Sequence, residues 1–195
     1  LYFQPLYSLV EDRVKGFEAL MRWPHPDHGM ISPVDFIPIA EESGMIVQLG
    51  EWAIREACAH AASWPGELSV AVNISPRQLQ ADGLNTCVVQ SLATTGLPAD
   101  RLELEITESV FIGDVERTLQ LLHALKSLGV RVALDDFGTG YSSLAYLRSF
   151  PFNKLKIDQS FVRALAEGGS AHAIVRAITT LADALGIETL AEGVE

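Results

Sequence analysis

Six stretches of the chain carry a polar residue at or near the end of an aliphatic run. Carboxylates, one amide and one lysine at the ends of parallel strands are typical of a metal-dependent hydrolase built on an α/β barrel. A purely structural explanation would leave several acids without partners, and desolvation would cost several kcal/mol for each. The residues are Glu18, Asn73, Glu105, the pair Asp135 and Asp136, Lys156, and Glu192.

The alternation of side chains along a strand predicts where these residues point. Ala133 and Asp135 share one face of their segment, whereas Val132 and Leu134 share the other. Because the aliphatic faces must pack against helices, the polar faces point into the barrel. We therefore expect one convergent group of side chains at one mouth of the barrel: Glu18, Asn73, Glu105, Asp135, Lys156 and Glu192.

Seven strand-like segments alternate with helix-like segments, which favours parallel β/α units. The first two strands are an exception, because the link Leu9–Arg13 is far shorter than the dozen or more residues of a parallel crossover. The sequence therefore predicts an α/β fold, a TIM-like (β/α)8 barrel with an antiparallel first strand. The expected strands are Tyr2–Ser8, Val14–Arg22, Leu68–Ile74, Arg101–Thr107, Val130–Asp136, Lys154–Asp158 and Ile187–Glu192.

Capping residues mark several helices between these strands. Ser32 followed by Pro33 predicts a helix start, and Gly44 predicts its end. Asp114 can cap a second helix that Gly129 ends. The other expected helices cover Glu51–Ser63 and Ser170–Leu185, and the capped second helix covers Val115–Leu128.

The length of 195 residues is about 50 short of the ~250 typical of such barrels, and the eighth strand is missing from the pattern. We interpret residues 1–195 as one domain that is truncated at its C-terminus. The chain begins with Leu1, which also favours a piece of a larger multidomain protein.

The net charge of −11 disfavours binding of duplex nucleic acid. No apolar run reaches the ~18 residues that a membrane span needs. Cys58 and Cys87 lack metal-ligand spacing, and buried free thiols in a reducing compartment are expected. The segment His25–His28 reads as a solvated turn, because none of the histidines shares metal-ligand spacing with the acids.

The excess of acids over bases near the barrel mouth indicates bound cations. Many carboxylates face only Lys156 and Arg22 as candidate counter-charges, so they cannot all stay ionised without cations. An all-oxygen set of ligands favours Mg²⁺, Mn²⁺ or Ca²⁺ over zinc. The glycine-rich segment Asp136–Ser143 follows directly, and we expect a mobile loop that presents Asp136 to a metal.

The motifs together resemble those of the EAL-domain cyclic di-GMP phosphodiesterases, in that family's order and over nearly the whole chain. Glu18-Ala19-Leu20, with Arg22 two positions later, resembles the signature motif of that family. The other matching motifs are Gln4-Pro5, Asn73-Ile74-Ser75, Glu105-Ile106-Thr107-Glu108, residues 135–144, Lys156-Ile157-Asp158 and Glu192-Gly193-Val194-Glu195.

The resemblance implies two Mg²⁺ or Mn²⁺ ions. By this resemblance Glu18, Asn73, Glu105 and Asp135 would hold one ion, and Asp135, Asp136 and Glu192 the other. Lys156, Glu192 and Glu108 would be the catalytic set, in which Lys156 orients or polarises the attacking water and Glu108 braces the loop after the fifth strand. The residues implied at the substrate are Gln4, Leu20, Arg22, Asp158 and Glu195.

The implied activity is hydrolysis of cyclic di-GMP to linear pGpG, in the cytoplasm or in the cytoplasmic domain of a membrane-anchored protein. Two alternatives stay open. One is a non-catalytic cyclic di-GMP receptor or protein-docking module, although such relatives usually lack several of the acids that this chain retains. The other is a different metal-dependent phosphoesterase. The resemblance leaves open whether the domain forms a homodimer.

Overall fold

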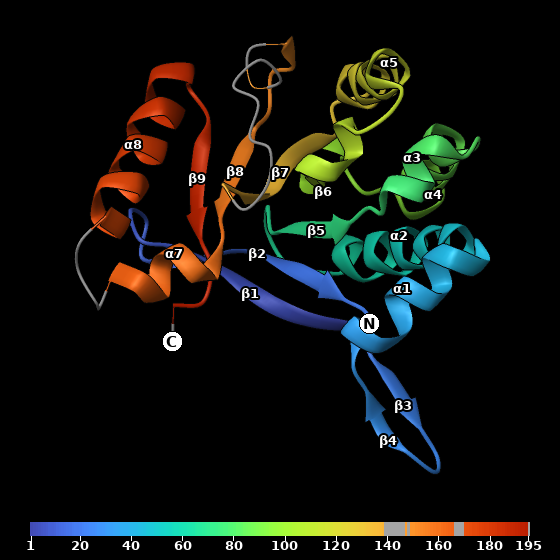
Figure 1. Cartoon of the computed structure of the whole chain (residues 1–195). Helices are drawn as coiled ribbons and strands as arrows, with labels where there is room; N and C mark the ends of the chain where they lie inside the picture. The colour runs from blue at the N-terminus through green and yellow to red at the C-terminus, as the bar shows by residue number, and fades with distance from the viewer. Residues whose placement is uncertain (139–146, 148, 166–169, 195) are drawn as a thin grey trace.

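One mixed seven-stranded sheet forms the centre of the computed structural model and curls around an interior (Figure 1). The structure describes residues 1–138, 147, 149–165 and 170–194. Strands β1 and β9 lie at the two edges of the sheet. In order across the sheet the strands are β1 (Tyr2–Ser8), β2 (Arg13–Leu20), β5 (Ser69–Asn73), β6 (Leu102–Thr107), β7 (Arg131–Phe137), β8 (Lys154–Ile157) and β9 (Glu188–Ala191).

The first strand pair is antiparallel, and every other pair of neighbours in this sheet is parallel. This confirms the prediction made from the short link between β1 and β2. In their register Gln4 lies opposite Glu18, and Tyr2 lies opposite Leu20. Residues opposite each other on antiparallel strands project to the same side of a sheet. Gln4 and Glu18 therefore share a face.

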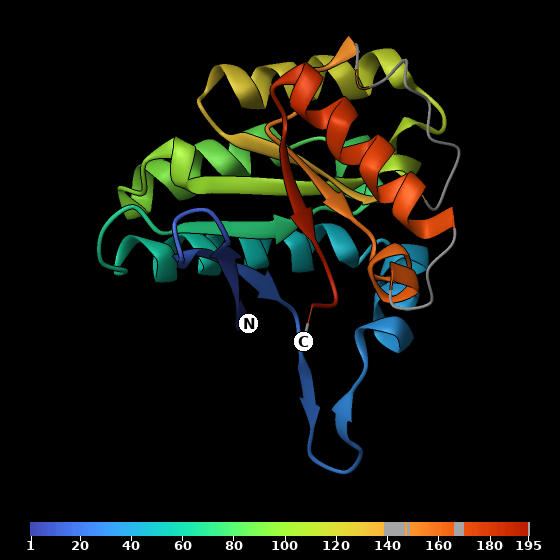
Figure 2. The same ribbon diagram turned by 90° about the vertical axis from the view of Figure 1, so that its left-hand side faces the viewer.

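Helices cover the outer face of the sheet, and their caps follow the signals in the sequence (Figures 1 and 2). Ser32 accepts a hydrogen bond from Val34 N, and Gly44 ends α1 in the left-handed region. Asp114 accepts a hydrogen bond from Arg117 N at the start of α5. The helices are α1 (Pro33–Ser43), α2 (Ile46–Ala62), α3 (Pro76–Gln80), α4 (Leu84–Thr95), α5 (Val115–Ser127), α7 (Gln159–Ala164) and α8 (Ser170–Leu185), with 3₁₀ turns η1 (Ala99–Arg101) and η2 (Glu108–Phe111).

The differences from the predicted elements are local. Helix α2 begins five residues before the expected Glu51, at Ile46. A two-stranded hairpin, β3 (Trp23–His25) and β4 (Gly29–Ile31), was not predicted and projects away from the rest of the fold (Figure 2). Its turn is the predicted turn between His25 and His28, where Asp27 N donates a hydrogen bond to Nδ1 of His25. Strands of three residues are too short to show alternation.

The aliphatic faces of the strands make the core, as the alternation predicts. Val70, Val72, Leu104 and Leu134 are all buried in it. Both cysteines are free and buried, as expected. Across the described part of the chain, no helix is long and apolar enough to cross a bilayer.

Candidate metal centre

The ammonium group of Lys156 lies at the centre of a cluster of acids inside the curled sheet. Its Nζ is 2.7 Å from Oε2 of Glu105, 2.8 Å from Oε1 of Glu192 and 3.1 Å from Oδ2 of Asp135. A longer contact of 3.5 Å reaches Oε2 of Glu18. The four acids come from or just after four different strands, β2, β6, β7 and β9. Lys156 itself is on β8 and is almost completely buried.

Asn73 joins the cluster from the end of β5. Its Nδ2 donates a hydrogen bond of 2.7 Å to Oε1 of Glu18. The strand register also sets Gln4 opposite Glu18. The structure thus brings together the six side chains that alternation sends to one mouth: Glu18, Asn73, Glu105, Asp135, Lys156 and Glu192.

The cluster is electrostatically strained, because one ammonium faces four carboxylates. Burial raises the pKa of the Glu105 carboxyl to about 8, although Lys156 pulls it down. Burial also raises the pKa of Glu192, again against the attraction of Lys156. Burial by itself would lower the pKa of Lys156, but attraction to the surrounding acids, Glu105 foremost, raises it. The acids therefore need more positive charge than Lys156 supplies.

Glu105 shows that the cluster fits a hard divalent cation. Its Oε2 is bonded to Lys156, whereas its Oε1 is buried and has no hydrogen-bond partner among the described residues. A buried carboxylate oxygen without a partner is costly, and coordination of a cation would satisfy it. The surrounding donors are carboxylate and amide oxygens, the set that Mg²⁺ and Mn²⁺ prefer.

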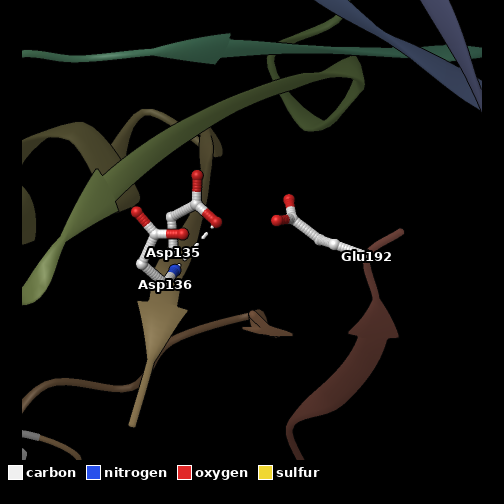
Figure 3. Close-up of side chains that lie close together, drawn as sticks. All are labelled: Asp135, Asp136 and Glu192. Atoms are coloured by element: carbon white, nitrogen blue, oxygen red, sulfur yellow. Dashed lines mark hydrogen bonds between the residues drawn. The ribbon is translucent and has the colours of Figure 1, made fainter. Parts of the chain in front are cut away.

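Asp135, Asp136 and Glu192 form a second grouping at the same mouth. One carboxylate oxygen of each lies within 4.8 Å of the others, and Figure 3 shows Glu192 pointing across to the two aspartates. Strict alternation would send Asp135 and Asp136 to opposite faces of β7. Asp136 instead has a φ of +53°, in the left-handed region, and the register between β7 and β8 shifts at this point. This irregularity brings both carboxylates to one side.

A backbone contact supports the turn at Asp136. Asp136 N donates a hydrogen bond of 2.9 Å to Oδ1 of Asp135. Burial and the negative charge of Asp135 raise the pKa of Asp136. Since a cation would lower that pKa, these neighbouring acids also fit a divalent ion.

Glu108 lies at the start of η2, directly after β6. Its Oε1 accepts a hydrogen bond of 3.2 Å from Gly138 N, just beyond the end of β7. The contact therefore joins Glu108 to Gly138, the first glycine of the glycine-rich segment. The rest of the expected mobile loop Asp136–Ser143, residues 139–143, lies outside the described residues.

Three of the residues expected at the substrate end or follow strands of the sheet. Arg22 is half-buried just after β2, and its Nη1 donates to the carbonyl of Met21. Leu20 ends β2. Asp158 caps α7, where its Oδ1 accepts a hydrogen bond from Ser160 N at 3.0 Å. Glu195 lies outside the described residues.

Sequence reasoning missed a second charged layer two residues earlier along the strands. Glu103 is buried and forms ion pairs with Lys154 and with Arg131, whose Nε is 3.2 Å from Oε2 of Glu103. Arg131 also pairs with Glu188 at 2.6 Å. The signal for this layer is the period of two, since Glu103 precedes Glu105 and Lys154 precedes Lys156. These acids have their own cations, which separates the layer chemically from the cluster at the mouth.

Comparisons with known proteins agree with this fold. The EAL domain model matches residues 1–195. An uncharacterized signaling protein of Caulobacter vibrioides is 55% identical over 195 residues, 100% of this chain and 24% of that protein. The PaMucR phosphodiesterase, solved as a c-di-GMP complex, is 42% identical with a TM-score of 0.94, over 99% of this chain and 80% of that chain.

A related structure was solved with metal. BlrP1 of Klebsiella pneumoniae, in a manganese and cyclic di-GMP complex, is 34% identical with a TM-score of 0.85, over 99% of this chain and 48% of that one. Because the chain spans only about a quarter of its curated relative from Caulobacter, these likenesses describe one domain of larger proteins. The chain belongs to the EAL domain family of cyclic di-GMP phosphodiesterases.

Proposed function

We propose that this domain hydrolyses cyclic di-GMP to linear pGpG with the help of two Mg²⁺ or Mn²⁺ ions. The observation that carries the proposal is the cluster of four carboxylates around the single buried ammonium of Lys156. Without bound cations so many acids would repel an anionic dinucleotide, so the cluster favours a function that uses metal ions. The two solved relatives reported above support the substrate, since both are complexes with cyclic di-GMP.

Two overlapping sets of ligands would hold the ions. Glu18, Asn73, Glu105 and Asp135 would hold one, with the free Oε1 of Glu105 as a donor. Asp135, Asp136 and Glu192, whose oxygens lie within 4.8 Å of one another, would hold the other. Bound ions of this kind supply an activated water and neutralise charge on a phosphodiester.

Lys156 would orient the attacking water, because its ammonium touches acids of both ligand sets. Its raised pKa keeps it protonated at neutral pH, so it acts as a hydrogen-bond donor and a positive charge rather than as a base. Glu108 would position the glycine-rich segment through Gly138 N.

Gln4, Leu20, Arg22, Asp158 and Glu195 are the proposed contacts to the substrate. Arg22 is the cation among them, and a guanidinium is well suited to a phosphate. Gln4 is next to Glu18 across the β1–β2 pair, which brings it to the edge of the metal ligands. The amide of Gln4 could therefore bind a substrate that also touches the ions. A domain with this activity would work in the cytoplasm, as one module of a larger signalling protein.

The test is identification of the product. Purified protein is incubated with cyclic di-GMP and Mg²⁺, and the nucleotides are separated by chromatography and identified by mass. We expect pGpG to accumulate with the wild type and not with Glu105→Gln, which keeps the size of the side chain. Recovery of unchanged cyclic di-GMP bound to the wild type would favour the receptor alternative and overturn the proposal.

A further inference from the structure

Two glycines follow the acids of the second grouping, and helix α7 packs against both of them. Gly138 has a φ of +99° and comes two residues after Asp136. Gly193 has a φ of +69° and comes directly after Glu192. Both turns therefore use backbone conformations that favour glycine, each within two residues of a candidate metal ligand.

The ring of Phe161 lies directly against Gly138. A Cβ atom at position 138 would lie 2.9 Å from Cε2 of Phe161 and 3.1 Å from its Cζ. Phe161 is held from behind, because it packs on the core, and Ile178 of α8 also borders Gly138. Gly138 N also donates a hydrogen bond to Oε1 of Glu108. The turn after Asp136 is thus held by contacts with an aromatic ring and with a carboxylate.

Gln159, at the start of the same helix, makes the matching contact to the other turn. A Cβ atom at position 193 would lie 2.8 Å from Cβ of Gln159. Helix α7 is itself fixed to the strand that carries Lys156, because Asp158 caps it and Phe161 N donates to Asp158 O at 3.1 Å. Glu192 N also donates to Ile157 O, at 3.1 Å.

These contacts matter because the second grouping depends on an irregular backbone. Asp136 reaches its neighbours only through a left-handed conformation, which persists when the surrounding structure enforces it. Phe161 and Glu108 both contact Gly138, two residues after Asp136, and so help to enforce this conformation. The acids Asp136 and Glu192 come from separate strands, and residues of α7 lie against the turns after both.

We propose that α7 is a positioning element for the metal centre, in which Phe161 fixes the turn after Asp136 and Gln159 fixes the turn after Glu192. The proposal rests on the proposed function only in assuming that these acids bind a divalent cation. Phe161 is a positioning residue rather than a catalytic one, because its ring lies against the backbone of Gly138 and acts through Asp136.

The test is Mn²⁺ binding, measured by titration calorimetry on chelator-treated protein. Shortening the ring with Phe161→Leu should weaken Mn²⁺ binding about 10–100-fold, the usual effect of losing a residue that orients metal ligands. Gly138→Ala should weaken binding too, since its Cβ would push against the same ring. Thermal unfolding in chelator serves as the check that each variant is folded.

Phe152→Leu is the matched control. Phe152 is buried against the rings of Phe111 and Phe150 and lies at the other end of β8 from Lys156. The Phe152→Leu variant should lower the unfolding temperature at least as much as Phe161→Leu and leave the Mn²⁺ dissociation constant unchanged.

Each other result overturns the inference. Equal Mn²⁺ affinity in the wild type and in Phe161→Leu would overturn it while leaving the proposed function intact. Equal losses of Mn²⁺ affinity in Phe161→Leu and Phe152→Leu would also overturn it, because general destabilisation would then explain both effects. A wild type that binds no Mn²⁺ would overturn the proposed function, and this inference with it.

Discussion

Lys156 Nζ lies 2.7 Å from Oε2 of Glu105, and both side chains are almost completely buried. This pair is the shortest ion pair in the cluster, and its ammonium is shared with the other acids. The same ammonium must also serve Glu18, Asp135 and Glu192, so one positive charge is shared by four carboxyl groups. Pairing is complete two residues earlier, where the single acid Glu103 meets both Lys154 and Arg131.

This contrast predicts opposite effects for two similar substitutions on one strand. Glu105→Gln should reduce Mn²⁺ affinity by at least about 100-fold, because it removes a ligand. Above about pH 8, where the Glu105 carboxyl of the folded protein ionises, it should also raise the unfolding temperature of the metal-free protein, because it removes a buried charge that shares its ammonium with three other acids. Glu103→Gln should leave Mn²⁺ affinity unchanged and destabilise the fold by about 3–5 kcal/mol, since it breaks a buried ion pair. Calorimetric titration and chemical denaturation measure the two properties separately. Similar profiles for the two variants would be incompatible with two distinct layers.

Replacing Lys156 should separate metal binding from catalysis. We expect Lys156→Met to keep or strengthen Mn²⁺ binding and to lower kcat by about 10²–10³-fold, the usual loss when one preorganised hydrogen-bond donor is removed. Without metal the variant should unfold at a lower temperature than the wild type, because the four acids lose their ammonium. The measurements are a Mn²⁺ titration and steady-state kinetics with cyclic di-GMP. Near-normal kcat in Lys156→Met would show that its role in hydrolysis is wrongly assigned.

The raised pKa values of the acids predict how stability depends on pH. Burial raises the pKa of Glu105 from 4.5 to about 8, and the pKa values of Asp136 and Glu192 are raised as well. Between about pH 4.5 and 8 the folded protein therefore holds protons that the unfolded chain releases, so the free energy of unfolding falls as pH rises. The raised pKa of Lys156 adds no slope in this window, because the lysine is charged in both states.

Bound metal should reverse that trend, because the cation replaces these protons. We expect metal-free protein to be more stable at pH 5.5 than at pH 8, and Mn²⁺ to raise the unfolding temperature more at pH 8 than at pH 5.5. Thermal unfolding at the two pH values, with chelator and with Mn²⁺, tests both statements. Metal-free stability that increased over this range would contradict the electrostatic description of the cluster.

The left-handed backbone of Asp136 predicts an order of stability among its variants. Asp136→Ala should be the least stable, since a left-handed conformation costs most L-residues about 1–2 kcal/mol. Asp136→Gly should be the most stable and Asp136→Asn intermediate. All three should lose activity, because each removes the carboxylate. Unfolding in denaturant ranks them, and an alanine variant as stable as the glycine variant would show that the turn is not strained.

Much of this arrangement follows from side-chain alternation. The period of two along β6, β7 and β8 was enough to predict that Glu105, Asp135 and Lys156 meet. The same rule fails at Asp136, where one left-handed residue brings a side chain to the other face. Nothing in the local sequence marks that conformation except the glycine two positions later.

Other parts of the structure depend on tertiary contacts that a linear pattern does not reveal. Helix α7 is too short for helical periodicity to appear, and its cap, Asp158, was instead assigned to the substrate by resemblance. The hairpin of β3 and β4 is equally short, and Pro24 interrupts its strand signal. The contact of Phe161 with Gly138 joins residues from two separate β/α units.

The most direct test of the central claim is the initial rate of cyclic di-GMP hydrolysis as metal is returned to chelator-treated protein. We predict no turnover in excess chelator and recovery with Mg²⁺ or Mn²⁺ that saturates at two ions per chain. Ca²⁺ should be a poor substitute, because its larger and less rigid coordination shell holds water less well for attack. Full turnover of cyclic di-GMP in excess chelator would contradict the account.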